Sequence, residues 1–213
     1  MREIILDTET TGLSAKSGDK IIEIGCLEII NRVETGNVFH AYINPERDIP
    51  YAATKIHGIT NEQVADKPTF AKVADDFLEF IKGSSLVIHN ATFDMNFLNQ
   101  ELINISYKEI SMESVIDTLK LARRKFPGAS ATLDALCKRF NISLSKRKYH
   151  GALLDSQLLA QVYLELTKAE QSDISFSAYQ SKHSKRKALE PRPHQATSEE
   201  YELHKELLAK IKK

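Results

Sequence analysis

Short apolar runs alternate with longer, periodically apolar segments over the first 166 residues. Runs rich in Ile, Leu and Val are typical of buried strands. They predict strands at 4–6, 21–30, 38–43, 86–88 and 115–117. Apolar residues at three- and four-residue spacing, together with capping residues, predict helices. These fall at 50–56, 60–63, 69–81, 92–102, 118–124, 133–140 and 151–166.

The order of these segments predicts an α/β fold. The first three strands are close together in the sequence, with a turn signal at 31–37, which favours an antiparallel meander. The later strands alternate with helices, which favours a mixed sheet flanked by helices. Ligand sites in such sheets tend to lie at the carboxyl ends of the strands.

Composition narrows the classes of function. The 213 residues include 29 basic and 29 acidic side chains, so any nucleic-acid surface must be local. Cys26 and Cys137 lie in apolar patterns without C-x-x-C spacing, which favours buried free thiols over a thiolate metal site. The first strand follows Met1 almost at once, and no run of about 18 apolar residues occurs. We therefore expect a cytoplasmic protein with no membrane contact.

Two carboxylates, Asp7 and Glu9, follow the first predicted strand. Residues two apart in an extended chain point to the same side, so the two side chains project together. Like charges held this close repel each other unless a cation lies between them, and oxygen ligands suit Mg²⁺ or Mn²⁺. The alternative is that both acids are turn residues that cap the following segment.

Three later residues are further candidates. Asp155 shares the inward stripe of its helix with Leu158, Leu159, Val162 and Leu166, where an acid is costly unless it is paired or binds a metal. A buried partner such as an Arg is the alternative. Asp94 near the start of its helix either joins a site or complements the helix dipole. His150 has the intrinsic pKa of a base at neutral pH, although alone it reads as an ordinary loop histidine.

The five residues occur in one order, as Asp7-x-Glu9, Asp94 within HNATFD, and His150-x-x-x-x-Asp155. This order resembles the DEDD exonuclease superfamily in its histidine subclass. More narrowly, it resembles the DnaQ-type epsilon (proofreading) subunits of bacterial DNA polymerase III. The resemblance covers roughly residues 3–168 and includes DTETTGL, KIIEIG, HGIT, DKPTF, VIHNATFD, SLSKR and HGALLDSQLLAQVY.

The resemblance implies a ribonuclease-H-like core and two-metal hydrolysis of phosphodiesters. Asp7 would bridge two Mg²⁺ or Mn²⁺ ions, Glu9 and Asp155 would complete the first, and Asp94 would support the second. His150 would take a proton from the attacking water. The expected activity is 3′–5′ exonuclease proofreading that removes mismatched 3′-terminal nucleotides as monophosphates, in the replicative DNA polymerase.

The resemblance also implies a site for a single-stranded or frayed 3′ end of DNA. The residues expected to bind it are Asp7, Glu9, Thr10, Thr11, Gly12, His57 and Asp155. His89 is a weaker candidate, because a structural hydrogen bond at a strand end explains it equally well. Unpairing of a duplex end costs least at a mismatch, so selectivity needs no reading of sequence. Basic runs at 123–125 and 146–148 either contact phosphates or are solvated helix ends and loops.

The composition changes after the exonuclease domain, which we place at 1–168. Residues 169–196 are polar with little periodicity and predict a flexible linker. Within it, Gln171, Ile174 and Phe176 of segment 171–176 resemble peptides that bind bacterial sliding clamps. A capping box at Thr197 and an apolar stripe predict a helix over 197–213.

By resemblance, this tail binds the polymerase catalytic (alpha) subunit, and a small theta-like subunit is a further possible partner. The alternative is that the tail packs back on the catalytic domain. Two other functions stay open at this point. One is an RNA 3′-end trimming exonuclease of the same superfamily, and the other is a binding scaffold that has lost hydrolysis. The presence of all five active-site residues argues against the scaffold.

Overall fold

The computed structural model describes residues 1–145, 149–183 and 197–211, without the side chains of 169–183. The chain divides into two compact units, Met1–Ser172 and Asp173–Lys213. The first contains the sheet and the predicted site residues, and the second contains the terminal helix α8 (Ser198–Ile211). No helix among the described residues is long and apolar enough to cross a lipid bilayer.

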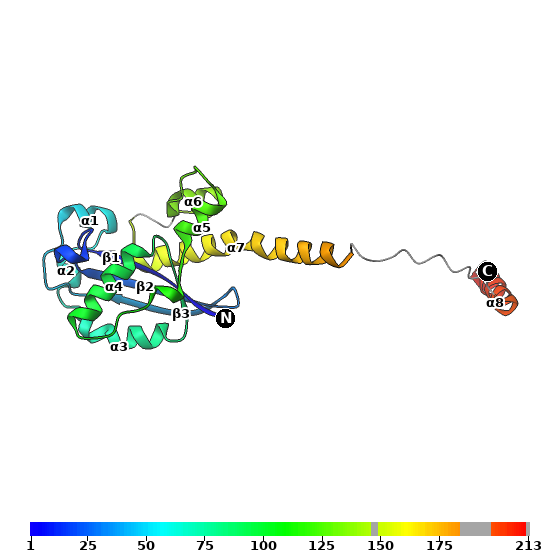
Figure 1. Cartoon of the computed structure of the whole chain (residues 1–213), viewed down its shortest axis with the longest axis horizontal. Helices are drawn as coiled ribbons and strands as arrows, with labels where there is room; N and C mark the ends of the chain where they lie inside the picture. Colours follow the sequence, from blue (N-terminus) through cyan, green and yellow to red (C-terminus); the bar gives the residue numbers. More distant parts are fainter. Residues whose placement is uncertain (146–148, 184–196, 212–213) are drawn as a thin grey trace. The chain divides into compact units, whose positions relative to one another are not determined.

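A five-stranded mixed sheet forms the centre of the first unit (Figure 1). Strands β1, β2 and β3 pair antiparallel, whereas β4 pairs parallel with both β1 and β5. The predicted α/β fold, an antiparallel meander of three strands extended by parallel strands, is confirmed. In the spatial order β3-β2-β1-β4-β5, the bounds are β1 Arg2–Thr10, β2 Ile21–Ile30, β3 Val33–Tyr42, β4 Ser85–Ile88 and β5 Val115–Asp117.

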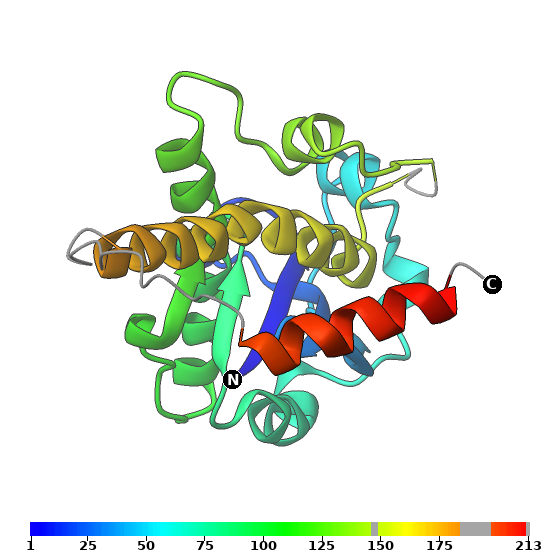
Figure 2. The same cartoon turned by 90° about the vertical axis from the view of Figure 1, so that its right-hand side faces the viewer.

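Helices cover both faces of this sheet (Figure 1 and Figure 2). Side chains alternate along β1, so Ile4 and Leu6 pack with α3 and α4 on one face, while Ile5 packs with α7 on the other. The helices are α1 Tyr51–His57, α2 Asn61–Val64, α3 Phe70–Ile81, α4 Thr92–Asn104, α5 Thr118–Lys125, α6 Leu133–Arg139 and α7 Ala152–His183, with 3₁₀ turns η1 Ala15–Ser17 and η2 Met112–Ser114.

The hairpin between β2 and β3 differs from the sequence prediction. A turn was expected over 31–37, but β3 begins at Val33 and the turn consists of Asn31 and Arg32. Both residues have positive φ, 51° and 70°, as in the two-residue turns that match strand twist. The prediction failed because the first half of β3 is exposed and polar, so it has no apolar signal.

β1 is also longer than its apolar core. It continues to Thr10, with Glu9 opposite Glu23 of β2 and a register shift after Glu9. Asp7 and Glu9 therefore lie within the strand rather than in the turn that follows it. This excludes the alternative in which they are turn residues.

α7 extends past Leu166, where the apolar stripe suggested its end, and continues to His183. The segment 167–183 contains no Gly or Pro to stop a helix. The first part of the expected linker is therefore helical, and the clamp-like segment 171–176 lies within it. The side chains of 169–183, and all of 184–196, lie outside the described residues, so the linker and the clamp peptide stay predictions.

The terminal helix begins as the capping box predicts. The Thr197 backbone N–H donates to Glu200 Oε2 at 2.8 Å, and the Glu200 N–H donates to Thr197 Oγ1 at 3.3 Å. These bonds satisfy backbone donors that would otherwise lack partners at a helix start. The predicted helix is thus present as α8 over Ser198–Ile211.

Candidate active site

Three elements bring the four predicted carboxylates together. Asp7 and Glu9 project from one side of β1, Asp94 lies in the first turn of α4, and Asp155 lies in the first turn of α7. Burial raises the pKa of Asp7 well above its usual value, and the charges of Asp94, Glu9 and Asp155 raise it further. The acids are therefore close enough to interact strongly, as predicted from the sequence.

Asp94 is anchored to β1 by a residue that the sequence reasoning missed. Thr8 donates both its backbone N–H, at 3.1 Å, and its hydroxyl, at 2.7 Å, to Asp94 Oδ1. Thr8 lies between the two β1 acids and faces the opposite side of the strand. Burial raises the pKa of Asp94 to about 7, although these hydrogen bonds oppose the shift. The position of the Thr8 hydroxyl between two acids of one strand was the sequence signal that could have identified this residue.

His150 lies at the edge of the carboxylate cluster. Its Nδ1 is 3.2 Å from Asp155 Oδ2, and its side chain is 47% exposed whereas that of Asp155 is 4% exposed. Ligand atoms of Glu9, His150 and Asp155 all lie within 4.8 Å of one another. The predicted base thus combines contact with the acids and access to water.

The His57-Gly58 loop supports the histidine. The His150 backbone N–H donates to Ile56 O at 3.1 Å. Gly58 has a φ of +75°, and a Cβ there would lie 3.0 Å from the Tyr149 ring. A side chain at Gly58 would therefore displace the residue that precedes His150. The HGIT motif therefore contacts the segment that contains His150, and its His57 also lines a cavity.

The start of α7 is fixed against β2 by backbone proximity and two polar side chains. A Cβ on Gly25 would lie 2.3 Å from the Ala152 carbonyl carbon, so only glycine fits. Ser156 donates its hydroxyl to Gly25 O at 2.8 Å, and Glu23 Oε2 accepts the Ala152 N–H at 3.1 Å. These positioning residues were missed, although an acid inside the apolar IIEIG strand was a usable signal.

The donor set fits divalent metal ions. Asp7 and Asp94 form no ion pair with Lys or Arg within the described parts of the chain. The nearby acid Glu101, for comparison, pairs with Lys20 at 3.0 Å. Buried carboxylates without such a partner are costly as anions, and oxygen donors suit Mg²⁺ and Mn²⁺.

A cavity of about 480 Å³ adjoins the carboxylates and is lined by five of the seven residues predicted to bind the 3′-terminal nucleotide. We call it the terminal-nucleotide cavity. The other two, Asp7 and Asp155, line a different cavity. His57 Nδ1 accepts the Ile59 N–H at 3.0 Å, and its buried Nε2 has no hydrogen-bond partner among the described residues. Burial lowers the pKa of His57, so the ring is neutral and Nε2–H is a donor. The cavity is lined by Glu9, Thr10, Thr11, Gly12 and His57, among others.

Comparisons with known proteins agree with this geometry. The model of an exonuclease family of RNase T type matches residues 4–163. The DNA polymerase III subunit epsilon of Rickettsia felis is 49% identical over 224 residues, which cover 100% of this chain and 98% of the relative. The chain belongs to the family of DNA polymerase III epsilon subunits.

Two solved structures support the fold of this epsilon family member. Exonuclease X in complex with 5′ overhanging duplex DNA has a TM-score of 0.62 and 31% identity, covering 78% of this chain and 92% of that one. The nuclease domain of 3′hExo, a DEDDh family member bound to rAMP, has a TM-score of 0.69 and 21% identity, covering 79% and 92%. The ribonuclease-H-like fold and the 3′–5′ proofreading exonuclease activity are confirmed, and the DNA role is supported over RNA trimming.

Two predicted side chains of the epsilon fold have structural partners. His89 Nδ1 lies 2.9 Å from Thr118 Oγ1, which favours the structural explanation for this residue. Thr11 is fully buried, and its hydroxyl accepts the Lys20 N–H at 3.0 Å, so it shapes the loop over the cavity. The basic run at 146–148 lies outside the described residues.

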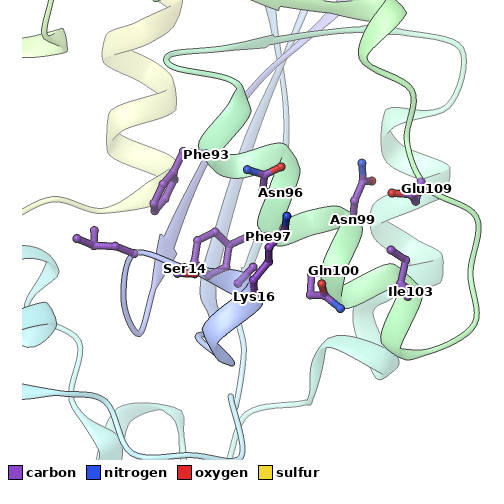
Figure 3. Close-up of a pocket in the computed structure, with 11 residues that line it drawn as sticks. Ser14, Lys16, Phe93, Asn96, Phe97, Asn99, Gln100, Ile103 and Glu109 are labelled. Carbon is purple, nitrogen blue, oxygen red and sulfur yellow. The ribbon is translucent and has the colours of Figure 1, made fainter.

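Another cavity, of about 430 Å³, lies between η1 and α4 (Figure 3). It shares Leu13 and Phe93 with the terminal-nucleotide cavity but contains none of the catalytic acids. The Asn99 amide exchanges hydrogen bonds with the Ile110 backbone, at 2.8 and 3.1 Å, and Gln100 donates to Asn104 at 3.0 Å. These amides stabilise α4 and the segment that follows it.

Proposed function

We propose that Asp7, Glu9, Asp94 and Asp155 hold two Mg²⁺ or Mn²⁺ ions and that the enzyme releases mismatched 3′-terminal nucleotides as monophosphates. When bound, such ions stabilise the charge on the attacking and leaving oxygens of an in-line displacement. The carboxylates bind and orient the ions, and Thr8 keeps Asp94 in place through its two hydrogen bonds.

The proximity of His150 to Asp155 and Glu9 carries this proposal. His150 accepts a proton from the water that attacks the terminal phosphodiester. Its half-exposed ring can pass that proton on to solvent, because it lies at the edge of the cluster rather than inside it. General-base catalysis of this kind contributes about 10²–10⁴-fold to a rate.

The 3′-terminal nucleotide occupies the terminal-nucleotide cavity. The Nε2–H of His57 donates to an oxygen of that nucleotide, since a buried donor without a partner is otherwise unfavourable. Only an unpaired end reaches this cavity. A mismatched end unpairs at lower cost than a matched one, so selectivity follows from the stability of the duplex end.

An assay with a labelled primer–template tests this function. A 5′-labelled primer on its template, with magnesium, should lose its terminal nucleotide faster when that nucleotide is mismatched. Release of nucleoside 5′-monophosphate, resolved by chromatography, identifies the bond that breaks. Release from the 5′ end, or equal rates on an RNA primer and a DNA primer, would contradict the proposal.

We propose that α8 binds the polymerase catalytic subunit. Its large apolar side chains are 46–70% exposed, and such a group on one short helix is unusual. They are Tyr201, Leu203, Leu207, Leu208 and Ile211. Tethering would then keep the exonuclease near the primer end at high effective concentration. Clamp binding through 171–176 and a theta-like partner are proposals that rest on resemblance alone. We place the reaction in the bacterial cytoplasm, where a replicative polymerase works.

A truncation after Pro193 tests the tail separately from catalysis. Hydrolysis of free single-stranded DNA should persist, whereas co-elution with the polymerase subunit should disappear. The full chain with Leu207→Ser and Leu208→Ser is the matched variant, and it should lose co-elution to a similar degree. Full co-elution of the truncated chain, or loss of its activity on single strands, would show that the tail has another role.

A further inference from the structure

A third cavity, of about 590 Å³, opens from the catalytic residues toward α5. We call it the α5 cavity. Asp7, His150 and Asp155 form one side, and Arg123 of α5 with the segment 129–133 forms the other. It shares no lining residue with the terminal-nucleotide cavity. The carboxylates thus lie between two separate cavities.

The path of the DNA strand through the site suggests what the α5 cavity binds. The scissile phosphate must lie at the carboxylates, and the terminal nucleotide occupies the cavity beyond Thr8 and Glu9. The rest of the strand must therefore leave on another side. The cavity of Figure 3 contains none of the catalytic acids and adjoins the terminal-nucleotide cavity through Leu13 and Phe93. Only the α5 cavity, among the described cavities, continues directly from Asp7 and Asp155.

Charge points to the same cavity. The chain has no net charge and its catalytic centre is strongly acidic, so an upstream phosphate needs a nearby cation. Arg123 is the one Lys or Arg lining the α5 cavity, and it makes no hydrogen bond or ion pair within the described residues. Its neighbours on α5 are engaged, Lys120 with Asp117 at 3.8 Å and Lys125 with Leu166 O at 2.6 Å.

His89 also lines the α5 cavity, but it does not compete with Arg123 as a cation. His89 bonds to Thr118, and burial lowers its pKa, so it is neutral at pH 7. An Arg side chain, by contrast, is always charged and matches phosphate oxygens with two parallel N–H donors.

We propose that the α5 cavity holds the first internucleotide phosphate on the 5′ side of the scissile bond and that Arg123 binds this phosphate. The proposal rests on the proposed placement of the terminal nucleotide. It makes Arg123 a substrate-binding residue that acts on the strand left behind rather than on the nucleotide released.

Two short substrates isolate this contact. The dinucleotide TpT has only the scissile phosphate, whereas TpTpT adds one phosphate upstream of it. Arg123→Gln should lower kcat/KM for the first cleavage of TpTpT about tenfold, as expected for loss of one charged hydrogen bond, and leave TpT unchanged. The salt dependence of log kcat/KM on TpTpT should weaken by a slope of about 0.7.

Lys120→Gln is the matched control, because it removes one positive charge from the same helix, one turn from Arg123 and outside the cavity lining. It should leave both substrates unchanged. An equal loss on TpT and TpTpT in Arg123→Gln, or no loss on either, would overturn the proposal. His57→Ala separates the two hypotheses, since it should slow both substrates. If it slows neither, the placement of the terminal nucleotide fails while the Arg123 measurement still reports on the α5 cavity.

Discussion

The first unit buries most of its large apolar residues, whereas α8 exposes them. Leu159 in α7 is 1% exposed and packs under the sheet, whereas Leu207 in α8 is 60% exposed. Both helices have apolar stripes, and that of α7 packs against the sheet within the first unit. A helix of this length is marginal alone in water. The comparison teaches that apolar residues hold the first unit together, whereas those of α8 are the basis for the proposal that this helix binds the polymerase subunit.

The two regions also differ in where they place charge. The first unit buries Asp94 and Asp155, each 3% exposed, at the cost of desolvating acids, whereas the charged residues of α8 are all exposed. Elsewhere in the first unit the buried acid Glu101 pairs with Lys20, whereas Asp94 has no such cation among the described residues, so its burial as an anion is costly until metal ions bind. The predictions below test this division of roles.

Asp155→Asn gives the largest expected effect. Hydrolysis of single-stranded DNA should fall by more than about 100-fold, since even outer partners of a metal site contribute about 10–100-fold. The melting temperature of the metal-free protein should stay level or rise, because one charge leaves a crowded cluster. Asp7→Asn is the companion variant. A large fall in the melting temperature of either would make these acids structural and remove the contrast.

His150→Gln should reduce turnover at neutral pH by about 10²–10⁴-fold while leaving metal binding intact. Calorimetric titration with Mn²⁺ measures the binding, and single-strand hydrolysis measures the rate. Because His150 is half exposed, the substitution should not change stability. Near-normal turnover would exclude it as the base.

A pair of identical substitutions tests the comparison directly. Leu159→Ala should destabilise the protein by about 2–5 kcal/mol, because it leaves a cavity in the core. Leu207→Ala should change stability by less than about 0.5 kcal/mol, as for other exposed positions. Urea unfolding of both variants gives the two values. A similar loss for Leu207→Ala would mean that α8 packs on the first unit after all.

Asp94→Asn should impair hydrolysis, because Asp94 is a proposed metal ligand, and its effect on the stability of the metal-free protein should appear as a change in pH dependence. The folded-state pKa of Asp94, about 7, is above the unfolded value, so the folded metal-free protein holds this proton more tightly. Ionisation of Asp94 therefore destabilises the folded state as pH rises from about 4 through 7. The stability of the variant relative to the native chain should increase across this window, by on the order of 1–3 kcal/mol. Unfolding with a chelator present measures it, and a flat difference would contradict the shift.

Local patterns made Asp7, Glu9 and Asp155 candidates because these acids occupy positions with strict geometry, and the family resemblance joined them with Asp94 and His150 into one predicted site. The i, i+2 spacing of Asp7 and Glu9 holds in any extended strand, and Asp155 interrupts an apolar stripe whose direction is known. Glu23 and Thr8 were missed because their roles depend on Ala152 and Asp94, which are distant in sequence. Only the assembled sheet brings such partners together.

The fold boundaries failed for a related reason. The first half of β3 is held by pairing with β2 rather than by burial, so no apolar signal marks its start at Val33. α7 extends to His183 because no Gly or Pro interrupts it. The prediction of a linker relied on the polar composition of this segment and did not consider that it lacks helix breakers. Patterns of burial predict buried elements well and exposed ones poorly.

The close approach of α7 to Gly25 predicts that a substitution at this glycine would raise the mutation rate of the cells that carry it. Fidelity would depend on a position that never meets DNA, because a single added methyl group would push the start of α7, and with it Asp155, away from the sheet. A strain carrying Gly25→Ala would keep every catalytic side chain and still accumulate substitutions like a strain without proofreading. Fluctuation assays on such a strain would reveal a mutator allele that inspection of the catalytic residues alone would overlook.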